Sequence, residues 1–297
     1  MDVAIRDAMV PKVEGRSFFQ LLRDIGVSSV EIELSEYAVT PHVPDPEGKP
    51  YKYDTARSTL RLKQRLDDEG VRCAAVLMAT DFAGEHAERH VNWVQVGLET
   101  AYLLGAPVVR IDPLTADRSL PPQRVRDRFV DRVTQVLSKP MFRTALPADL
   151  GIENHGPFAN DPAWLDYVLA ALPHPQVGLT LDTGNFYWFG FALESVYELV
   201  EKYAPAAKHT HLKNINYPAD VAARRRETGH AYDQYCCPAH EGNLDVSRVV
   251  RSLLGAGYDR DLCVEDESLF KHPPGAGVDV LRREVAAVRA ALAEARA

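Results

Sequence analysis

The sequence predicts a single α/β domain folded as a (β/α)8 barrel. Eight apolar, strand-like runs alternate with eight helix-like segments along the chain. No linker or shift in composition divides the chain, so residues 1–297 are expected to form one domain. A barrel of this type needs about 250 residues, which leaves room in a chain of this length for two loop insertions.

The strands are expected, in order, at Val3–Asp7, Ser29–Leu34, Val71–Leu77, Pro107–Asp112, Leu150–Asn154, Val177–Asp182, Ala207–Lys213 and Leu262–Glu265. The helices between them are expected at Ser17–Ile25, Thr55–Glu69, Glu85–Leu104, Pro122–Leu137, Pro162–Leu172, Leu193–Tyr203 and Val246–Leu254, with the last one from about Val278 to the C-terminus.

Helix boundaries support this assignment. Gly26, Gly70 and Gly105 follow the first three helices, where glycine commonly ends a helix. A pair of prolines precedes the fourth helix, as is typical of helix starts, and glycines at 255 and 257 end the seventh. The last helix is amphipathic, because apolar residues recur at steps of three and four. They are Val278, Leu281, Val285, Val288 and Leu292.

The main competing fold is a doubly wound open sheet, which carries a glycine-rich phosphate turn after its first strand. Here the first strand is followed by Ala8-Met-Val-Pro-Lys instead, so the barrel is favoured.

Composition excludes several classes of function. The net charge of −8 gives no reason to expect a nucleic acid partner. Four cysteines do not form a disulfide framework, and Cys73 and Cys263 are expected to be small core residues. No apolar run reaches 18 residues and no targeting signal precedes the first strand, so neither a membrane nor export is expected and the cytoplasm is the default location.

Four strands end on residues that can bind a metal ion: Glu153, Asp182, His211 and Glu265. Active sites of barrels form at the carboxyl ends of the strands, where these side chains are expected to meet. Three carboxylates and one imidazole suit Mn²⁺, Mg²⁺ or Co²⁺ better than a thiolate-rich zinc site would. Taken singly, each residue can also be a helix cap or loop anchor, and either glutamate can form a buried salt bridge.

Other polar residues share faces with these ligands, since side chains alternate along a strand. His155 is expected to bind a substrate hydroxyl or to anchor a loop. Lys213 is expected to neutralise a developing oxyanion or a carboxylate, or only to pair with Glu241. His209 is expected to be an interior histidine rather than a ligand.

Arg110 and Asp112 either pair with each other or reach the substrate, and Glu31 and Glu33 leave the same two possibilities open. In the aromatic cluster 186–189, Trp188 is a candidate for stacking on a sugar, while at least two of the rings are expected to pack in the core.

Two long loops are expected, at Val39–Tyr53 and at residues 214–243. The second is of a length typical of functional lids. Its arginines at 224–226 either clamp a carboxylate or phosphate or, as the favoured alternative, form a solvated helical turn. Its adjacent Cys236 and Cys237 are expected only to pack the lid.

Four motifs together resemble the xylose isomerase-like TIM barrel family, the sugar phosphate isomerase/epimerase superfamily. They are Gly151-Ile-Glu-Asn-His-Gly156, Leu181-Asp-Thr-Gly184, His209-Thr-His-Leu-Lys213 and the tail Glu241-Gly-Asn-Leu-Asp245 with Val264-Glu265. The resemblance implies that Glu153, Asp182, His211 and Glu265 hold one divalent metal ion, with Mn²⁺ favoured over Co²⁺ or Mg²⁺. It also implies that the two glutamates act as acid and base.

The chain departs from the family pattern at two places. Many members have histidine at the position of Asn185, where it contacts the substrate or a second metal; asparagine still donates hydrogen bonds. The third strand ends in Leu77-Met78-Ala79, without the histidines that endonuclease IV uses to bind zinc. DNA repair is therefore not expected.

The expected function is a metal-dependent sugar isomerase or epimerase that abstracts a proton next to a carbonyl through an enediolate, with a small carbohydrate as substrate. The alternative is a lyase or dehydratase on a keto-sugar, keto-inositol or 3-keto-glycoside, C-glycoside cleavage included. A third hypothesis is a binding subunit without catalysis. Relatives often form homo-oligomers, and some C-glycoside-cleaving relatives need a small partner subunit.

Overall fold

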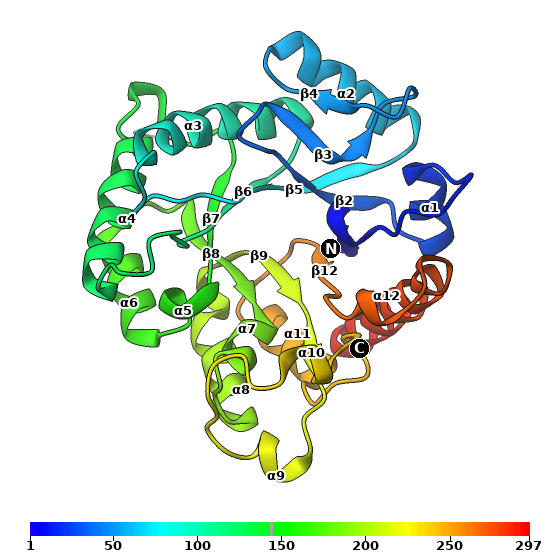
Figure 1. The fold of residues 1–297 in the computed structure, drawn as a ribbon, viewed down its shortest axis with the longest axis vertical. Coiled ribbons are helices and arrows are strands. Elements are labelled where there is room, and N and C mark those ends of the chain that lie inside the picture. The colour runs from blue at the N-terminus through cyan, green and yellow to red at the C-terminus, as the bar shows by residue number, and fades with distance from the viewer. Residues whose placement is uncertain (143–144) are drawn as a thin grey trace. The chain divides into compact units, whose positions relative to one another are not determined.

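The computed structural model, which describes residues 1–142 and 145–297, contains a closed barrel of eight parallel strands (Figure 1). The strands follow one another around the barrel in the order β1-β12-β9-β8-β7-β6-β5-β2. Their bounds are β1 (Val3–Arg6), β2 (Ser29–Glu33), β5 (Arg72–Met78), β6 (Val108–Ile111), β7 (Asp149–Glu153), β8 (Val177–Asp182), β9 (Ala207–Leu212) and β12 (Leu262–Val264). The predicted (β/α)8 fold is confirmed.

The main helices are α1 (Phe18–Ile25), α2 (Ala56–Asp68), α3 (Ala87–Leu104), α4 (Pro122–Leu137), α6 (Pro162–Ala171), α8 (Leu193–Tyr203), α11 (Val246–Gly255) and α12 (Pro274–Arg296). All eight expected helices are present. The last one begins at Pro274 rather than near Val278, because proline at its first position and Gly275 and Gly277 in its first turn hide the helical pattern.

The two segments expected to be loops contain secondary structure. Residues 39–52 form a hairpin of β3 (Val39–Pro44) and β4 (Pro50–Lys52). Its turn is made by Asp45, whose Oδ1 accepts hydrogen bonds from the backbone of Glu47 and Lys49, and by Gly48 at φ +79°. The lid-like segment 214–243 holds β10 (Asn214–Ile215), α9 (Ala219–Ala222), α10 (Tyr232–Tyr235) and β11 (Cys236–Cys237).

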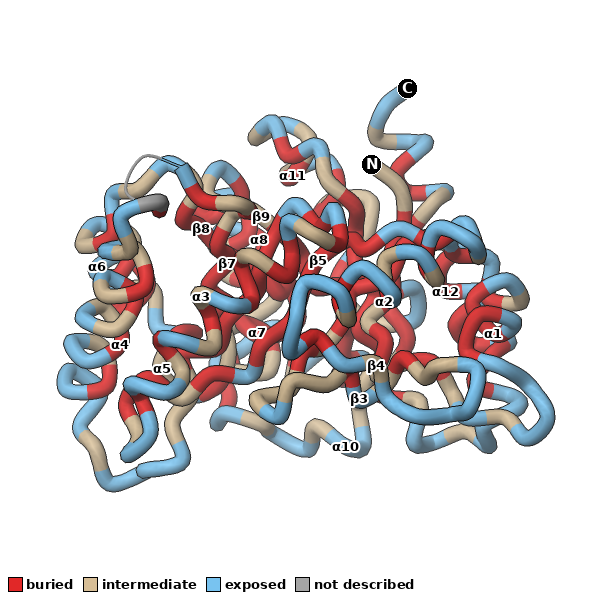
Figure 2. The backbone as a smooth tube through the Cα atoms, turned by 90° about the horizontal axis from the view of Figure 1, so that it is seen from above, coloured by how far each residue is buried: buried red, intermediate tan, exposed pale blue. Residues whose placement is uncertain are grey.

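The chain divides into two compact units, each described by itself. Unit 1 comprises residues 1–31 and 181–297, and unit 2 comprises residues 32–180. In unit 1, α12 packs against α1 and α11, and the predicted apolar stripe from Val278 to Leu292 is buried. In unit 2, α3 packs between α2 and α4. Figure 2 shows the strands mostly buried and the helices with one buried and one exposed face.

The register of the paired strands determines which polar residues lie opposite one another in each unit. In unit 1, Cys263 of β12 pairs with His211 of β9, and Arg6 of β1 pairs with Glu31 of β2. In unit 2, Gly151 lies so close to β8 that a Cβ atom there would be 2.5 Å from Thr180 Oγ1. The glycine of the Gly-Ile-Glu motif thus permits the close approach of β7 and β8.

One further expectation is met. Cys73 and Cys263 are buried, as predicted. Within the residues described, no helix is both long and apolar enough to cross a membrane.

Candidate metal centre

Three of the four predicted ligands come together in unit 1. Asp182 is the last residue of β8, His211 lies in β9, and Glu265 directly follows β12. Each offers a ligand atom within 4.8 Å of the others, and each is at most 2% exposed. The fourth predicted ligand, Glu153, ends β7 in unit 2.

Asp182 has two roles because its two oxygens face different partners. Oδ1 caps the short helix α7 (Thr183–Trp188) by accepting hydrogen bonds from the backbone N–H groups of Gly184 and Asn185, at 2.8 and 2.9 Å. Oδ2 lies 3.0 Å from Lys213 Nζ. A Cβ at position 184 would lie 2.4 Å from Lys213 Cγ, so this glycine lets the lysine pass.

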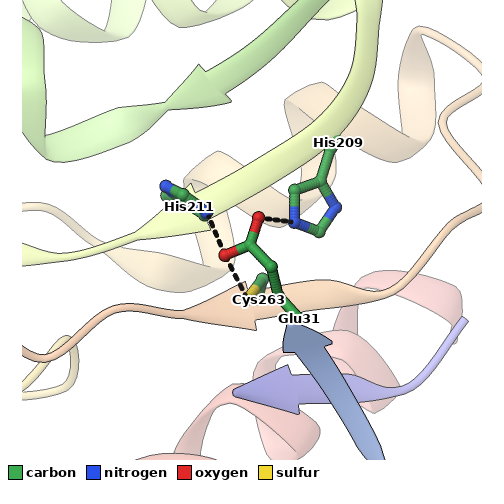
Figure 3. A group of neighbouring side chains, drawn as sticks. All are labelled: Glu31, His209, His211 and Cys263. Carbon is green, nitrogen blue, oxygen red and sulfur yellow. Dashed lines mark hydrogen bonds and ion pairs between the residues drawn. The ribbon is translucent and has the colours of Figure 1, made fainter. Parts of the chain in front are cut away.

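His211 is held on both ring nitrogens. Nε2 lies 2.8 Å from Glu31 Oε2 (Figure 3). Nδ1 lies 3.4 Å from Glu265 Oε2. His209 Nε2 lies 3.2 Å from the other oxygen of Glu31, so His209 is an interior histidine, as predicted. Glu31 thus pairs with buried histidines, which favours pairing over a contact with substrate. Glu33 pairs with His42 at 3.4 Å within unit 2.

Lys213 lies among three carboxylates. Its ammonium is 3.0 Å from Asp182, 3.1 Å from Glu265 and 3.3 Å from Glu267. Pairing with Glu241, the alternative drawn from sequence, is therefore wrong. Burial opposes the charge on Lys213, but the carboxylates of Asp182 and Glu265 outweigh it and raise the pKa of Lys213 well above its usual value.

Sequence reasoning missed three neighbours of this cluster. Glu267, two residues beyond Glu265, accepts a hydrogen bond from Tyr232 of the lid segment. Arg6 Nη1 lies 2.5 Å from Glu265 Oε1. The position of Arg6 at the end of β1, where strand-end polar residues gather, was a usable signal; Tyr232 had none.

The two carboxylates among the candidate ligands of unit 1, Glu265 and Asp182, differ in pKa. Burial alone would raise the pKa of Glu265, but Lys213, His211 and Arg6 hold it well below its usual range. Burial, reinforced by the charge of Glu265, raises the pKa of Asp182 in spite of Lys213. Two carboxylates and an imidazole in one buried cluster fit a hard divalent cation, which would also relieve the repulsion between Asp182 and Glu265.

In unit 2, Glu153 belongs to a second buried cluster. Arg110 Nη1 lies 2.8 Å from Asp112 Oδ2, and Arg110 Nη2 forms an ion pair with Glu153. His155 Nδ1 lies 2.7 Å from Asp112 Oδ1 and 3.7 Å from Glu153 Oε2. Arg110 thus pairs with Asp112, one of its two predicted roles, and the salt bridge considered for Glu153 is also formed. The His155 side chain is 36% exposed.

The aromatic cluster after β8 is split. Phe186 and Tyr187 are fully buried, as expected for at least two of these rings. Trp188 is half-buried and lines a cavity of about 500 Å³ with Gly229 and Tyr232, among others. Asn185, also predicted to bind substrate, is buried at 3% exposure in α7.

Arg226 of the lid segment is buried, so the predicted solvated turn is wrong for this residue, whereas Arg224 and Arg225 are exposed. The guanidinium of Arg226 is stacked on Tyr187 and Tyr217, with ring centroids 4.5 and 4.6 Å away. It donates hydrogen bonds to the carbonyls of Tyr187 and Phe191. These partners are distant in sequence, so the lid pattern alone did not reveal them.

Comparisons agree with this fold. The family described as Xylose isomerase-like TIM barrel matches residues 19–286. The solved structure of an L-ribulose 3-epimerase is 17% identical with a TM-score of 0.67, covering 100% of this chain and 96% of its own. The IOLI protein with a bound zinc atom is 17% identical with a TM-score of 0.68, covering 98% and 99%.

A third similar structure is the probable 3-DHS dehydratase AsbF of Bacillus anthracis, which is 16% identical with a TM-score of 0.62 and covers 97% of this chain and 99% of its own. No curated protein matches the sequence.

Proposed function

Because the chain belongs to the xylose isomerase-like TIM barrel family, we propose that it is a divalent-metal-dependent sugar isomerase or epimerase. The observation that carries the proposal is the meeting of Asp182, His211 and Glu265 in one buried cluster beside the ammonium of Lys213. Such a set holds a cation and offers a base and a proton donor next to it. The similar structures include one named as a sugar epimerase and one with bound zinc.

One divalent ion, with Mn²⁺ preferred over Co²⁺ or Mg²⁺, would be held by Asp182, His211 and Glu265. Glu153 is proposed as the fourth ligand because it ends β7, and the carboxyl ends of barrel strands share one rim. When bound, the ion supplies a Lewis acid that polarises the substrate carbonyl and stabilises enediolate charge.

The residues of the chain would move the proton. Glu265 is proposed as the base that accepts a proton from the carbon next to the carbonyl. It is ionised, because Lys213, His211 and Arg6 hold its pKa well below the usual range. Glu153 would return a proton on the other side of the substrate. Lys213 stays charged and would stabilise negative charge on the substrate oxygen.

Substrate orientation is assigned to four residues. His155 is the most exposed member of the unit 2 cluster and would bind a substrate hydroxyl group. Arg110 would orient Glu153 and contact substrate beside it. Trp188 would stack on the sugar from its cavity, and Asn185 would donate a hydrogen bond.

Elimination from a keto-sugar, keto-inositol or 3-keto-glycoside is the second candidate. It uses the same proton abstraction and then expels a leaving group, whose developing negative charge the ammonium of Lys213 would stabilise by a hydrogen bond. One similar structure is named as a probable dehydratase, and Asn185 replaces the histidine of many epimerases.

The test combines elemental analysis with a proton-exchange assay in D₂O on a panel of keto-sugars. About one divalent ion per chain and metal-dependent deuterium uptake are expected. Unchanged product mass indicates an isomerase or epimerase, whereas loss of water or an aglycone indicates a lyase. A protein that binds no divalent ion and exchanges no proton would contradict both and favour a binding subunit.

A further inference from the structure

Glu31 is a fully buried carboxylate enclosed by three side chains of unit 1 (Figure 3). His211 Nε2 is 2.8 Å from one oxygen, and His209 Nε2 is 3.2 Å from the other. The thiol of Cys263 is 3.9 Å from the oxygen that faces His211. Nothing in the proposed reaction uses Glu31 or His209, so their burial together needs a separate explanation.

The cluster is rigid because strands carry it. Glu31 lies in β2, His209 and His211 lie in β9, and Cys263 lies in β12. His211 is directly opposite Cys263 in the β9–β12 pairing. The four residues are between 0 and 1% exposed, so no solvent competes for the oxygens of Glu31.

Hydrogen-bond chemistry then determines which nitrogen of His211 can bind a cation. Both ring nitrogens face carboxylates, which only accept hydrogen bonds: Nε2 faces Glu31 at 2.8 Å and Nδ1 faces Glu265 at 3.4 Å. An imidazole that binds a cation keeps one proton, and that proton belongs on Nε2, because Nε2 makes the shorter contact and Glu31, unlike Glu265, is not a proposed ligand. The lone pair is then on Nδ1, which lies 3.4 Å from Glu265 Oε2, on the side of the proposed ligands. A ligating histidine commonly donates its other N–H to a carboxylate in this way.

We infer that Glu31 and His209 are positioning residues, which hold the His211 imidazole so that Nδ1 is the atom offered to the metal ion. His209 acts through Glu31, because its contact with Oε1 fixes the carboxylate that orients His211. Cys263 packs against the cluster and makes only a long sulfur contact. The inference rests on the proposed metal site and adds the residues that orient its single imidazole.

The first test is calorimetric titration of the chelator-treated full chain with Mn²⁺. Glu31→Gln is expected to weaken binding about 10- to 100-fold, the usual effect of losing such a carboxylate. Asp261→Asn is the matched control, since this buried carboxylate of unit 1 accepts a hydrogen bond from Ser29 Oγ at 2.6 Å and is outside the cluster. It should bind Mn²⁺ like the wild type.

Two variants of His209 separate hydrogen bonding from packing. His209→Gln keeps an N–H donor toward Glu31 and should retain affinity, whereas His209→Leu should weaken binding. Cys263→Ala should leave affinity unchanged. Equal affinity in wild type, Glu31→Gln and His209→Leu would overturn the inference, whereas a wild type that binds no Mn²⁺ would overturn the proposed function itself.

A second measurement does not depend on the variants folding. In wild-type protein with ¹⁵N-labelled histidine and ¹¹³Cd²⁺, coupling of the metal to Nδ1 of His211 is expected, with the proton on Nε2. Coupling to Nε2 would overturn the inference. So would a second bound ¹¹³Cd²⁺ coupled to His209, because the cluster would then itself be a metal site.

Discussion

Glu265 in unit 1 and Glu153 in unit 2 are both buried glutamates at the carboxyl ends of strands, yet their charges are balanced differently. Glu265 lies 3.1 Å from the ammonium of Lys213 and 2.5 Å from the guanidinium of Arg6. Glu153 pairs with Arg110, whose guanidinium also holds Asp112 at 2.8 Å. In unit 1 the carboxylates are shared among several cations, whereas in unit 2 one planar guanidinium links two of them.

The kind of cation that pairs with a buried carboxylate decides whether the carboxylate can still bind an ion or a substrate. An unpaired buried charge is costly, so each carboxylate needs a partner. Arginine binds carboxylates in a fixed planar geometry, whereas lysine is a point charge on a flexible stem. Lys213 can therefore give way to a divalent ion or a substrate more readily than Arg110 can, which makes the cluster of unit 1 the better candidate for chemistry.

The largest effect is expected at Glu265. Glu265→Gln should abolish measurable turnover, since loss of a general base costs about 10²- to 10⁴-fold. His211→Ala should lose more metal affinity than Glu265→Gln, because it removes the only imidazole proposed as a ligand. Turnover and Mn²⁺ titration of both variants test this. Near-normal turnover in Glu265→Gln would remove its acid/base role.

Arg110→Met tests whether Glu153 is a structural ion pair or a ligand. Removing the guanidinium leaves Asp112 and Glu153 buried without it, so the free energy of unfolding should fall by about 3–5 kcal/mol. If Glu153 binds the ion, Mn²⁺ should recover more stability in the variant than in the wild type.

Urea unfolding with and without Mn²⁺ measures both effects. Arg251→Met is the control, because its side chain is half exposed on α11 and its ion pairs with Asp245 and Glu294, at 4.0 and 3.7 Å, should contribute less than about 1 kcal/mol. Equal gains from Mn²⁺ in the wild type and in Arg110→Met would place Glu153 with the structural salt bridges.

Lys213→Met tests whether the ammonium in the unit 1 cluster takes part in the reaction. If the ammonium stabilises charge developing on the substrate, kcat should fall about 10²-fold, as when an oxyanion donor is removed. Lys202→Met, a change at the surface of α8, is the control and should keep wild-type kinetics. An unchanged kcat in Lys213→Met would make this lysine structural.

The smallest effect is expected at Glu284, another buried glutamate, which lies in α12. Burial and the nearby Asp266 and Glu241 raise its pKa well above the ordinary 4.5, which favours the protonated, neutral form. Its Oε1 accepts the backbone N–H of Ala239 at 2.5 Å.

The raised pKa means that Glu284 stabilises the fold below pH 4.5 and that this stability is lost as the pH rises toward its folded pKa. Each pKa unit corresponds to about 1.4 kcal/mol. Glu284→Gln cannot ionise, so its advantage in unfolding free energy should grow from pH 4.5 to pH 8. Parallel stability–pH curves for the two proteins would contradict this.

Much of the fold was predictable because its signals are local. Strand runs, helix-ending glycines and the stripe from Val278 to Leu292 each lie within a few residues of one another. The hairpin at 39–52 was missed because its strands contain prolines, and the start of α12 was missed because its first turn is rich in glycine. For the candidate site, strand parity predicted which residues point inward but not which of them pair.

The sequence by itself determined that polar side chains end strands β7, β8, β9 and β12, and that a barrel brings such ends to one rim. Only the tertiary structure decided the partners: Glu31 for His211, Arg110 for Glu153, Glu267 for Lys213, and two stacked tyrosines for Arg226. The physical reason is the separation in sequence between the residues that interact. A strand run or a cap depends on neighbours in the chain, whereas the ion pairing of a buried carboxylate depends on packing between segments as much as 259 residues apart, as for Arg6 and Glu265.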